Sequence, residues 1–110
     1  MSIFRRVKNA DINEGVKTAG TTKGSLLIDV RSEEEYASGH VPGSINIPTE
    51  HLSLIEKRAP DKTTPLFLYC RSGARSARAV KILKKAGYQQ ISDIGGIDAW
   101  RGKTEKGAKK

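Results

Sequence analysis

Cysteine, aromatic residues and long hydrophobic runs are all scarce in this sequence, and each scarcity narrows the possible classes of protein. One of the 110 residues is a cysteine, Cys70, so no internal disulfide can form. His40 and His51 add too few ligands for the usual four-coordinate zinc site, and we expect no metal. A free thiol is typical of a reducing compartment, which favours a cytoplasmic location.

The apolar segments are too short for a membrane protein. The longest unbroken one is Leu66–Cys70, whereas a membrane-spanning helix needs roughly 20 apolar residues. The opening stretch MSIFRRVKNADINEG contains two arginines but no apolar segment behind them, unlike a secretory signal. We therefore expect a soluble protein of one domain with no membrane partner.

The strongly positive charge raises the question of a nucleic-acid partner, but the distribution of that charge argues against one. The formal net charge is +8, and residues 101–110 account for half of it, with five basic residues and one acidic residue (5 − 1 = +4). Aromatic residues, on which bases stack, make up only 5% of the chain. We predict a single domain over residues 1–100 and a basic, disordered tail over residues 101–110.

Strand and helix patterns alternate along the chain, which predicts an α/β fold. Short apolar segments suggest strands at residues 3–7, 25–30, 44–47, 66–70 and 88–94. Helix signals predict helices at residues 12–19, 32–39, 49–59 and 76–86, with a short closing helix near residues 95–102. Such alternation produces βαβ units, so we predict a central, mainly parallel sheet of about five strands flanked by helices.

The single thiol stands where a strand passes into a helix. Cys70 ends the predicted strand, and the predicted helix begins near Ser76, after the loop residues Arg71, Ser72, Gly73, Ala74 and Arg75. Ligands bind beyond the carboxyl ends of the strands in open parallel sheets. A tight turn with inward N–H groups, together with a helix N-terminus, makes a cradle for an anion. Nearby arginines favour the thiolate, so the sequence predicts a nucleophile in a site for an anionic substrate.

Several of these residues have a structural interpretation as well. A lone cysteine at a strand end is often a small buried hydrophobic residue. Ser72 and Ser76 are candidate donors to a bound anion, although Ser76 also suits a helix N-cap. Asp29 and Arg31 end another strand at the same rim. Arg31 would add positive potential or Asp29 would orient Arg75, but we favour a structural ion pair that holds two loops together.

Three motifs together resemble the rhodanese family of sulfurtransferases. YCRSGARSARAVKILKKAGY is similar to the family's active-site loop and following helix, LLIDVRSEEEYASGHVPGSINIP to its amino-terminal signature, and DIGGIDAW to its carboxy-terminal signature. The likeness runs in order from about Leu26 to Trp100. It is a likeness to a single-domain member, which implies the three-layer rhodanese-like fold.

The resemblance implies a thiosulfate sulfurtransferase type of enzyme without a metal or organic cofactor. Cys70 would take the outer sulfur of a small anion such as thiosulfate, hold it as a persulfide, and pass it to cyanide, a small thiol or a partner protein. The segment from Arg71 to Ser76 would bind the substrate and stabilise the thiolate and the persulfide. Because there is no second cysteine, the acceptor must be external. For the motif residue His40 we favour a hydrogen bond to the backbone over a role as general base, and we expect His51 to be exposed.

Two other functions remain open. Some cysteine phosphatases and arsenate reductases share the rhodanese fold, but their signature places an arginine six positions after the cysteine. This chain has Ser76 there and Arg75 one position earlier, and the shorter loop suits a single sulfur atom. Some rhodanese-like domains have lost the cysteine and are non-catalytic binding modules, whereas Cys70 and a full loop are present here.

Overall fold

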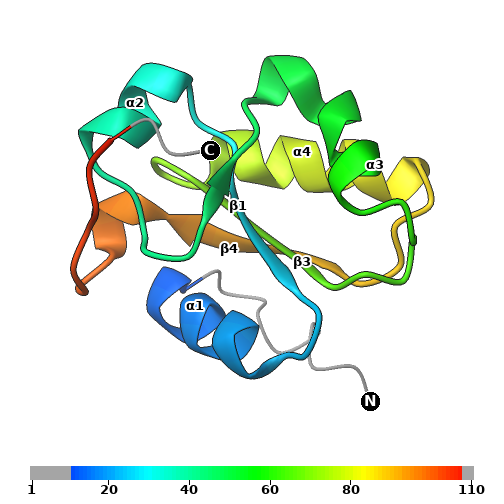
Figure 1. Cartoon of the computed structure of the whole chain (residues 1–110), viewed down its shortest axis with the longest axis horizontal. Helices are drawn as coiled ribbons and strands as arrows, with labels where there is room; N and C mark the ends of the chain where they lie inside the picture. The colour runs from blue at the N-terminus through cyan, green and yellow to red at the C-terminus, as the bar shows by residue number, and fades with distance from the viewer. Residues whose placement is uncertain (1–10, 108–110) are drawn as a thin grey trace.

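The computed structural model describes residues 11–107, which form three layers around a parallel sheet (Figure 1). Four parallel strands lie in the order β2-β1-β3-β4: β1 (Leu26–Asp29), β2 (Ile45–Asn46), β3 (Leu66–Cys70) and β4 (Ile91–Gly96). The predicted α/β fold is confirmed. Four strands lie within residues 11–107 instead of about five, and the strand expected at residues 3–7 falls outside the described residues.

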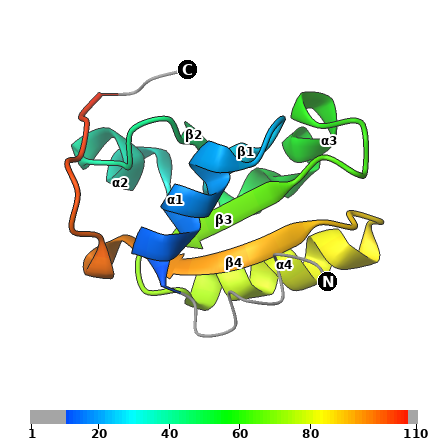
Figure 2. The ribbon, with the colours of Figure 1, turned by 90° about the horizontal axis from the view of Figure 1, so that it is seen from below.

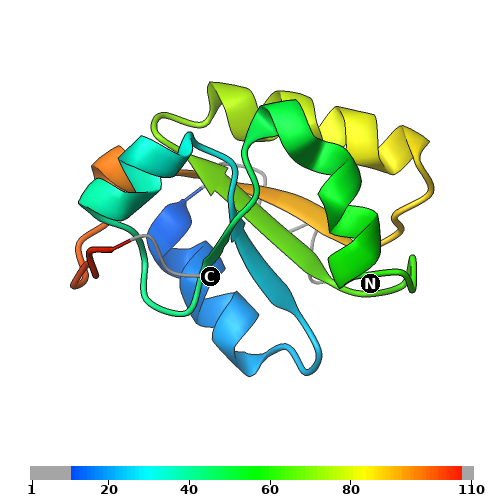
Figure 3. The ribbon, with the colours of Figure 1, turned by 45° about the horizontal axis from the view of Figure 1, so that its top comes forward.

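Helices cover both faces of the sheet. Helix α1 (Ile12–Thr21) lies on one face (Figure 2), and α3 (Ile55–Arg58) and α4 (Ala74–Lys85) lie on the other with the 3-10 helix η2 (Thr49–Leu54) (Figure 3). Helix α2 (Glu33–Ser38) and the 3-10 helix η3 (Ile97–Ala99) lie near the carboxyl ends of the strands. No helix within residues 11–107 has the length and apolar character to cross a membrane.

The alternation of side chains along β3 decides which way the cysteine points. Leu66, Leu68 and Cys70 join the hydrophobic cluster shared with α3 and α4, whereas Phe67 and Tyr69 join the cluster shared with α1. Successive residues of a strand face opposite sides of the sheet, and all five residues of β3 are buried. Ending this strand at residue 70 therefore turns the sulfur towards α4.

Side chains cap the starts of two helices. The Asp11 side chain caps α1, and Ser32 with Glu35 forms the reciprocal capping box of α2. Each side chain satisfies backbone N–H groups that have no partner inside the helix. Helix α1 continues to Thr21, two residues past the predicted range of 12–19.

Other element boundaries near the site also differ from the sequence prediction. Helix α4 begins at Ala74 and not at Ser76, because Gly73 takes the N-cap position. Strand β4 covers residues 91–96 in place of 88–94, because its last residue, Gly96, still pairs with Cys70. The expected helix over residues 49–59 is divided into η2 and α3, and His51 within it has non-helical backbone angles.

Residues 101–107 run along the domain, which differs from the disordered tail expected for residues 101–110. Glu105 and His40 exchange both backbone hydrogen bonds, at 2.8 and 2.9 Å. The backbone N–H of Gly107 donates to the carbonyl oxygen of Ala37 at 2.9 Å. Composition alone suggested a solvated segment, but backbone groups can pair whatever the side chains are. This pairing places the segment beside α2.

Candidate active site

Cys70 lies at the end of β3, beside the first turn of α4, with three donors around its sulfur. The Gly73 N–H is 3.0 Å from Sγ, and the N–H and hydroxyl of Ser76 are each 3.4 Å away. Both N–H groups belong to the N-terminus of a helix, where they have no intrahelical partner. The sulfur therefore takes the place of a capping side chain, and the helix N-terminus favours negative charge on it.

Two glycines allow the loop to close so tightly. Gly73 has a φ of +106°, in the left-handed region that side chains disfavour. Gly96, on the neighbouring strand, lies directly against the loop, and a Cβ there would come within 2.2 Å of the Arg71 carbonyl oxygen. The absence of a side chain at Gly96 thus lets the loop backbone pack directly against the end of β4.

The cysteine is buried, but its surroundings are not purely apolar. Cys70 is 1% exposed and packs in the cluster under α4. The loop residues Arg71, Ser72 and Ala74 are exposed above it. A cysteine that served only as a hydrophobic residue would have no need of N–H groups directed at its sulfur. The cysteine is therefore buried, as expected for a hydrophobic residue, and its sulfur has polar contacts, as expected for a nucleophile.

Arg75 is paired with Glu35 and not with Asp29. Its two terminal nitrogens donate to the two carboxylate oxygens of Glu35 at 2.8 and 3.0 Å. The hydrogen bond from Arg75 lowers the pKa of Glu35 to about 2 against the opposing effect of partial burial, and the same bond raises the pKa of Arg75. This ion pair ties the cysteine loop to α2, a role of Glu35 that its capping-box signature did not reveal.

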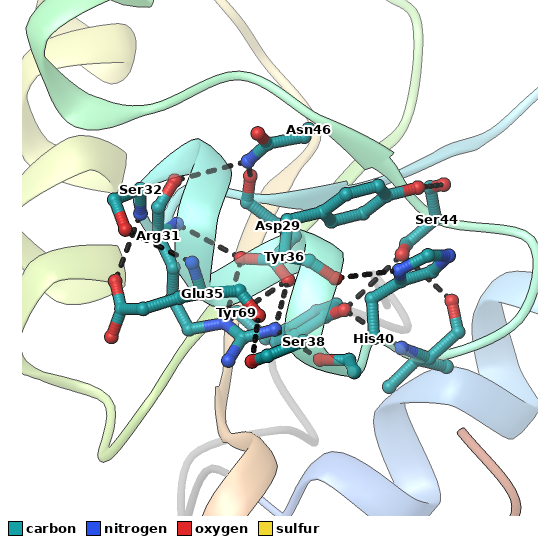
Figure 4. A network of polar contacts seen from close by, with 12 residues as sticks. Asp29, Arg31, Ser32, Glu35, Tyr36, Ser38, His40, Ser44, Asn46 and Tyr69 are labelled. Atoms are coloured by element: carbon teal, nitrogen blue, oxygen red, sulfur yellow. Dashed lines mark hydrogen bonds and ion pairs between the residues drawn. The ribbon is translucent and has the colours of Figure 1, made fainter. Parts of the chain in front are cut away.

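Asp29 and Arg31 form the structural ion pair that we favoured, although it joins different parts of the chain than expected. The Arg31 guanidinium donates to Asp29 Oδ2 at 2.7 Å and to the carbonyl oxygen of Gly39 at 2.7 Å (Figure 4). Both residues are buried: Arg31 is 5% exposed and Asp29 is 0% exposed. The pair braces the end of β1 against the loop after α2, so the Arg31 charge is neutralised there.

The two histidines have the structural positions that we favoured, and Trp100 is a packing residue. His40 is buried, and its Nδ1 lies 2.8 Å from the carbonyl oxygen of Tyr36, whose ring stacks on the imidazole (Figure 4). His51 is exposed. Trp100 packs, partly buried, against the cluster under α1.

A second group of polar residues lines an open cavity of about 390 Å³ beside the cysteine loop. Arg71, Asp93 and Asp98 contribute its charged groups. Arg71 is 67% exposed and lies 3.9 Å from Asp98. Ser76, which the sequence offered as a helix N-cap, is instead fully buried and donates to Asp93 Oδ1 at 2.7 Å. Sequence reasoning missed Asp93, although a polar residue near the carboxyl end of the strand beside β3 was a usable signal.

Three comparisons with known proteins, by family model, by sequence and by structure, identify the same family. A family model described as rhodanese-like domain matches residues 12–103. Thiosulfate sulfurtransferase PspE of Escherichia coli is 39% identical over 71 residues, covering 64% of this chain and 68% of that protein. The solved structure of a rhodanese with anions from E. coli superposes with a TM-score of 0.71 at 36% identity, covering 76% of this chain and 99% of that one.

Longer relatives contain the same domain as one of their parts. The adenylyltransferase and sulfurtransferase uba4 of Ogataea parapolymorpha is 37% identical over 95 residues, which are 86% of this chain but 24% of that protein. This chain therefore spans about a quarter of that relative, and only the domain is compared. The family model covers most of the chain, including every element around Cys70. The chain belongs to the rhodanese-like family of sulfurtransferases.

Proposed function

We propose that this protein transfers a sulfane sulfur atom from an anionic donor such as thiosulfate, through a persulfide on Cys70, to an external acceptor. One observation carries the proposal: the sulfur ends a parallel strand with two helix-start N–H groups and a hydroxyl within 3.4 Å. Donors so placed stabilise a negative charge on sulfur in a site from which water is excluded. Cys70 is the nucleophile, and the segment from Arg71 to Ser76 is the substrate loop.

The reaction has two half-reactions, as expected for covalent catalysis. In the first, the Cys70 thiolate attacks the outer sulfur of thiosulfate. A new S–S bond forms, the old one breaks, and its electron pair leaves with sulfite. In the second, a nucleophile such as cyanide or a thiol attacks the outer sulfur of the persulfide, and the electron pair of that S–S bond returns to Cys70 as thiolate.

Relatives support this assignment in different ways. The E. coli relative is named a thiosulfate sulfurtransferase, and the E. coli structure is that of a rhodanese with anions. Another relative, 38% identical over 82 residues, is named a putative sulfur carrier protein of Bacillus subtilis. Because Cys70 is the one cysteine of the chain, the persulfide has no internal thiol to react with. A small external thiol or a partner protein in a reducing, cytoplasmic setting is the acceptor that fits.

The burial of the sulfur implies that the loop moves during the reaction. Cys70 is 1% exposed, whereas the outer sulfur of the donor must come within bonding distance of it. Of the loop residues, Arg71, Ser72 and Ala74 are exposed, and Ser72 and Ala74 have short side chains. We expect the donor to enter as Arg71 and Ser72 shift, while the N–H groups of Gly73 and Ser76 stay in place.

The decisive test is mass spectrometry of the intact protein after incubation with thiosulfate. We expect the mass to rise by one sulfur atom, the sulfur to map to Cys70, and sulfite to be released in equal amount. Cys70→Ser is the control and gains nothing. Addition of cyanide returns the wild-type mass and yields thiocyanate. Release of phosphate from p-nitrophenyl phosphate that depends on Cys70, without any gain of sulfur, would favour the phosphatase and overturn the proposal.

A further inference from the structure

We propose that Asp93 positions the Ser76 hydroxyl to take the thiol proton of Cys70, so that the three side chains form a proton relay that ionises the buried sulfur. The inference deepens the proposed sulfur transfer and rests on it. Ser76 is the group that touches the reacting sulfur. Asp93 acts through Ser76 and is a positioning residue.

The relay follows from the position of one hydroxyl proton. Ser76 Oγ has three acceptors within reach: Asp93 Oδ1 at 2.7 Å, the Gly73 carbonyl oxygen at 3.1 Å and Cys70 Sγ at 3.4 Å. The carboxylate is the nearest and the charged one, and hydrogen bonds from hydroxyl to carboxylate are the strong ones. The proton therefore points at Asp93, which leaves the lone pairs of Oγ to accept the S–H of Cys70.

Protons and charges balance along this path. As the sulfur attacks the donor, the S–H proton moves to Ser76 Oγ, and the original hydroxyl proton moves to Asp93 Oδ1. Asp93 becomes a neutral acid, and the regenerated hydroxyl now directs its proton at the sulfur, where it stabilises the persulfide anion. When the acceptor removes the outer sulfur, the thiolate recovers its proton by the reverse path.

Burial makes such a path necessary, and the cavity connects it to solvent. Cys70 and Ser76 are 1% and 0% exposed, so bulk water does not collect the thiol proton directly. Asp93 is partly exposed and lines the cavity of about 390 Å³ beside the loop. Its Oδ1 also accepts the backbone N–H of Gly95 at 2.9 Å, which fixes the carboxylate next to Ser76.

The charged groups around Asp93 are already paired with others. Arg71 and Asp98 share the cavity with it and lie 3.9 Å from each other. On the α4 side, Arg75 is bonded to Glu35. Within residues 11–107 no guanidinium or ammonium group forms an ion pair with Asp93. Its Oδ1 instead accepts the Ser76 hydroxyl and the Gly95 N–H, so the carboxylate stays directed at Ser76.

The test is Asp93→Asn, because the amide oxygen still accepts from Ser76 and Gly95 but cannot take up a proton. Two rates are measured, Cys70 alkylation by iodoacetamide and persulfide formation with thiosulfate. Both are taken at about pH 6.5 and about pH 9.5, on either side of the ordinary cysteine value of about 8.5. At the lower pH we expect both rates to fall about 10-fold or more. This minimum lies below the roughly 100- to 10,000-fold that general-base catalysis usually contributes. At the higher pH both rates should approach the wild-type rates, because hydroxide that reaches the sulfur when the loop shifts removes the proton in place of the relay.

The direction of the change distinguishes the relay from simple electrostatics. If Asp93 acted only as a negative charge near the sulfur, its removal would favour the thiolate and speed alkylation at the lower pH, which would overturn the relay. Equal losses at both pH values would also overturn it, since they would indicate a structural role. Asp98→Asn is the matched control: it removes a charge from the same cavity without touching Ser76, and should keep the wild-type ratio of the two rates.

A second variant and a second readout keep the inference separate from the proposed function. Ser76→Ala should give the same pH pattern, and Ser76→Ala with Asp93→Asn should be no slower than the slower single variant, because both remove one pathway. Additive losses would contradict the relay. Alkylation does not need thiosulfate. If the wild-type protein gained no sulfur but the variants showed the expected loss of alkylation rate at the lower pH, the proposed function would be refuted and the relay would stand.

Discussion

The ion pair between Glu35 and Arg75 should stabilise the domain in a way that depends on pH, and Glu35→Gln tests this. A glutamine at this position can still serve in the capping box of α2, so the substitution removes mainly the interaction with Arg75. Two nearly parallel hydrogen bonds, of 2.8 and 3.0 Å, are at stake. They join residues that are 40 positions apart in the chain, and thereby hold the cysteine loop against α2.

The magnitude follows from the pKa of Glu35. Its fall from 4.5 to about 2 corresponds to an upper limit of roughly 3 to 3.5 kcal/mol, at about 1.36 kcal/mol per pH unit. The Arg75 side chain is 39% exposed and that of Glu35 is 26% exposed, so water screens the pair. We therefore expect Glu35→Gln to lower the free energy of unfolding at neutral pH by about 1–2 kcal/mol, above the value for a fully exposed pair.

The sign of the pH dependence is fixed by which state binds the proton first. Glu35 has the lower pKa in the folded protein, so the unfolded chain is protonated first as pH falls. The stabilisation is complete above about pH 4.5 and is lost as pH falls towards about 2. Urea unfolding of wild type and Glu35→Gln should therefore give curves that differ at neutral pH and converge near pH 2.

Glu34→Gln is the matched control for this experiment. Glu34 lies beside Glu35 in the first turn of α2 and is exposed, so its substitution should change the free energy of unfolding by no more than about 0.5 kcal/mol. A difference between wild type and Glu35→Gln that stayed constant from neutral pH to about pH 2 would refute the electrostatic explanation. So would an effect at neutral pH no larger than that of Glu34→Gln.

Three other substitutions test the packing around the site by urea unfolding. Arg75→Ala should destabilise about as much as Glu35→Gln, and the double variant hardly more than either, because both break one pair; additive losses would argue against that. Gly96→Ala would place a Cβ 2.2 Å from a loop carbonyl oxygen and should cost about 1–3 kcal/mol, whereas Gly20→Ala, with nothing within 4 Å, should be neutral or stabilising. Tyr69→Phe should lower the free energy of unfolding by about 1–3 kcal/mol, because the buried N–H of Val41 would lose its acceptor. That N–H now donates to the Tyr69 phenol oxygen at 3.0 Å.

The sequence predicted best those features that depend on neighbouring residues. The capping box of Ser32 and Glu35 joins residues three positions apart, and residue type alone is enough to indicate it. The alternation in β3 likewise fixes the direction of the Cys70 side chain once the strand is recognised. The sheet followed from the alternation of strand and helix signals, although the exact starts of α4 and β4 did not.

Contacts between residues that are far apart in the chain could not be predicted from the sequence. Arg75 has Asp29, Glu35 and Asp98 as acidic candidates, and only the folded arrangement of α2 and the loop selects Glu35. The partnership of Ser76 with Asp93 spans 17 positions and requires β3 and β4 to be adjacent. The path of residues 101–107 depends on backbone groups, which composition does not describe.

These contacts change the account of how the sulfur would be kept negatively charged. The sequence placed that task on Arg71 and Arg75, yet each guanidinium has a carboxylate nearby, Arg71 at 3.9 Å and Arg75 at 2.8 Å. Their net field at Cys70 is thereby reduced, and at the exposed Arg71 water and salt reduce it further. The groups within 3.4 Å of the sulfur are neutral dipoles, two N–H groups and one hydroxyl. Because the start of α4 holds the two N–H groups in place, they need little reorganisation when charge develops on the sulfur, which would make the helix start a better source of catalysis than the arginines.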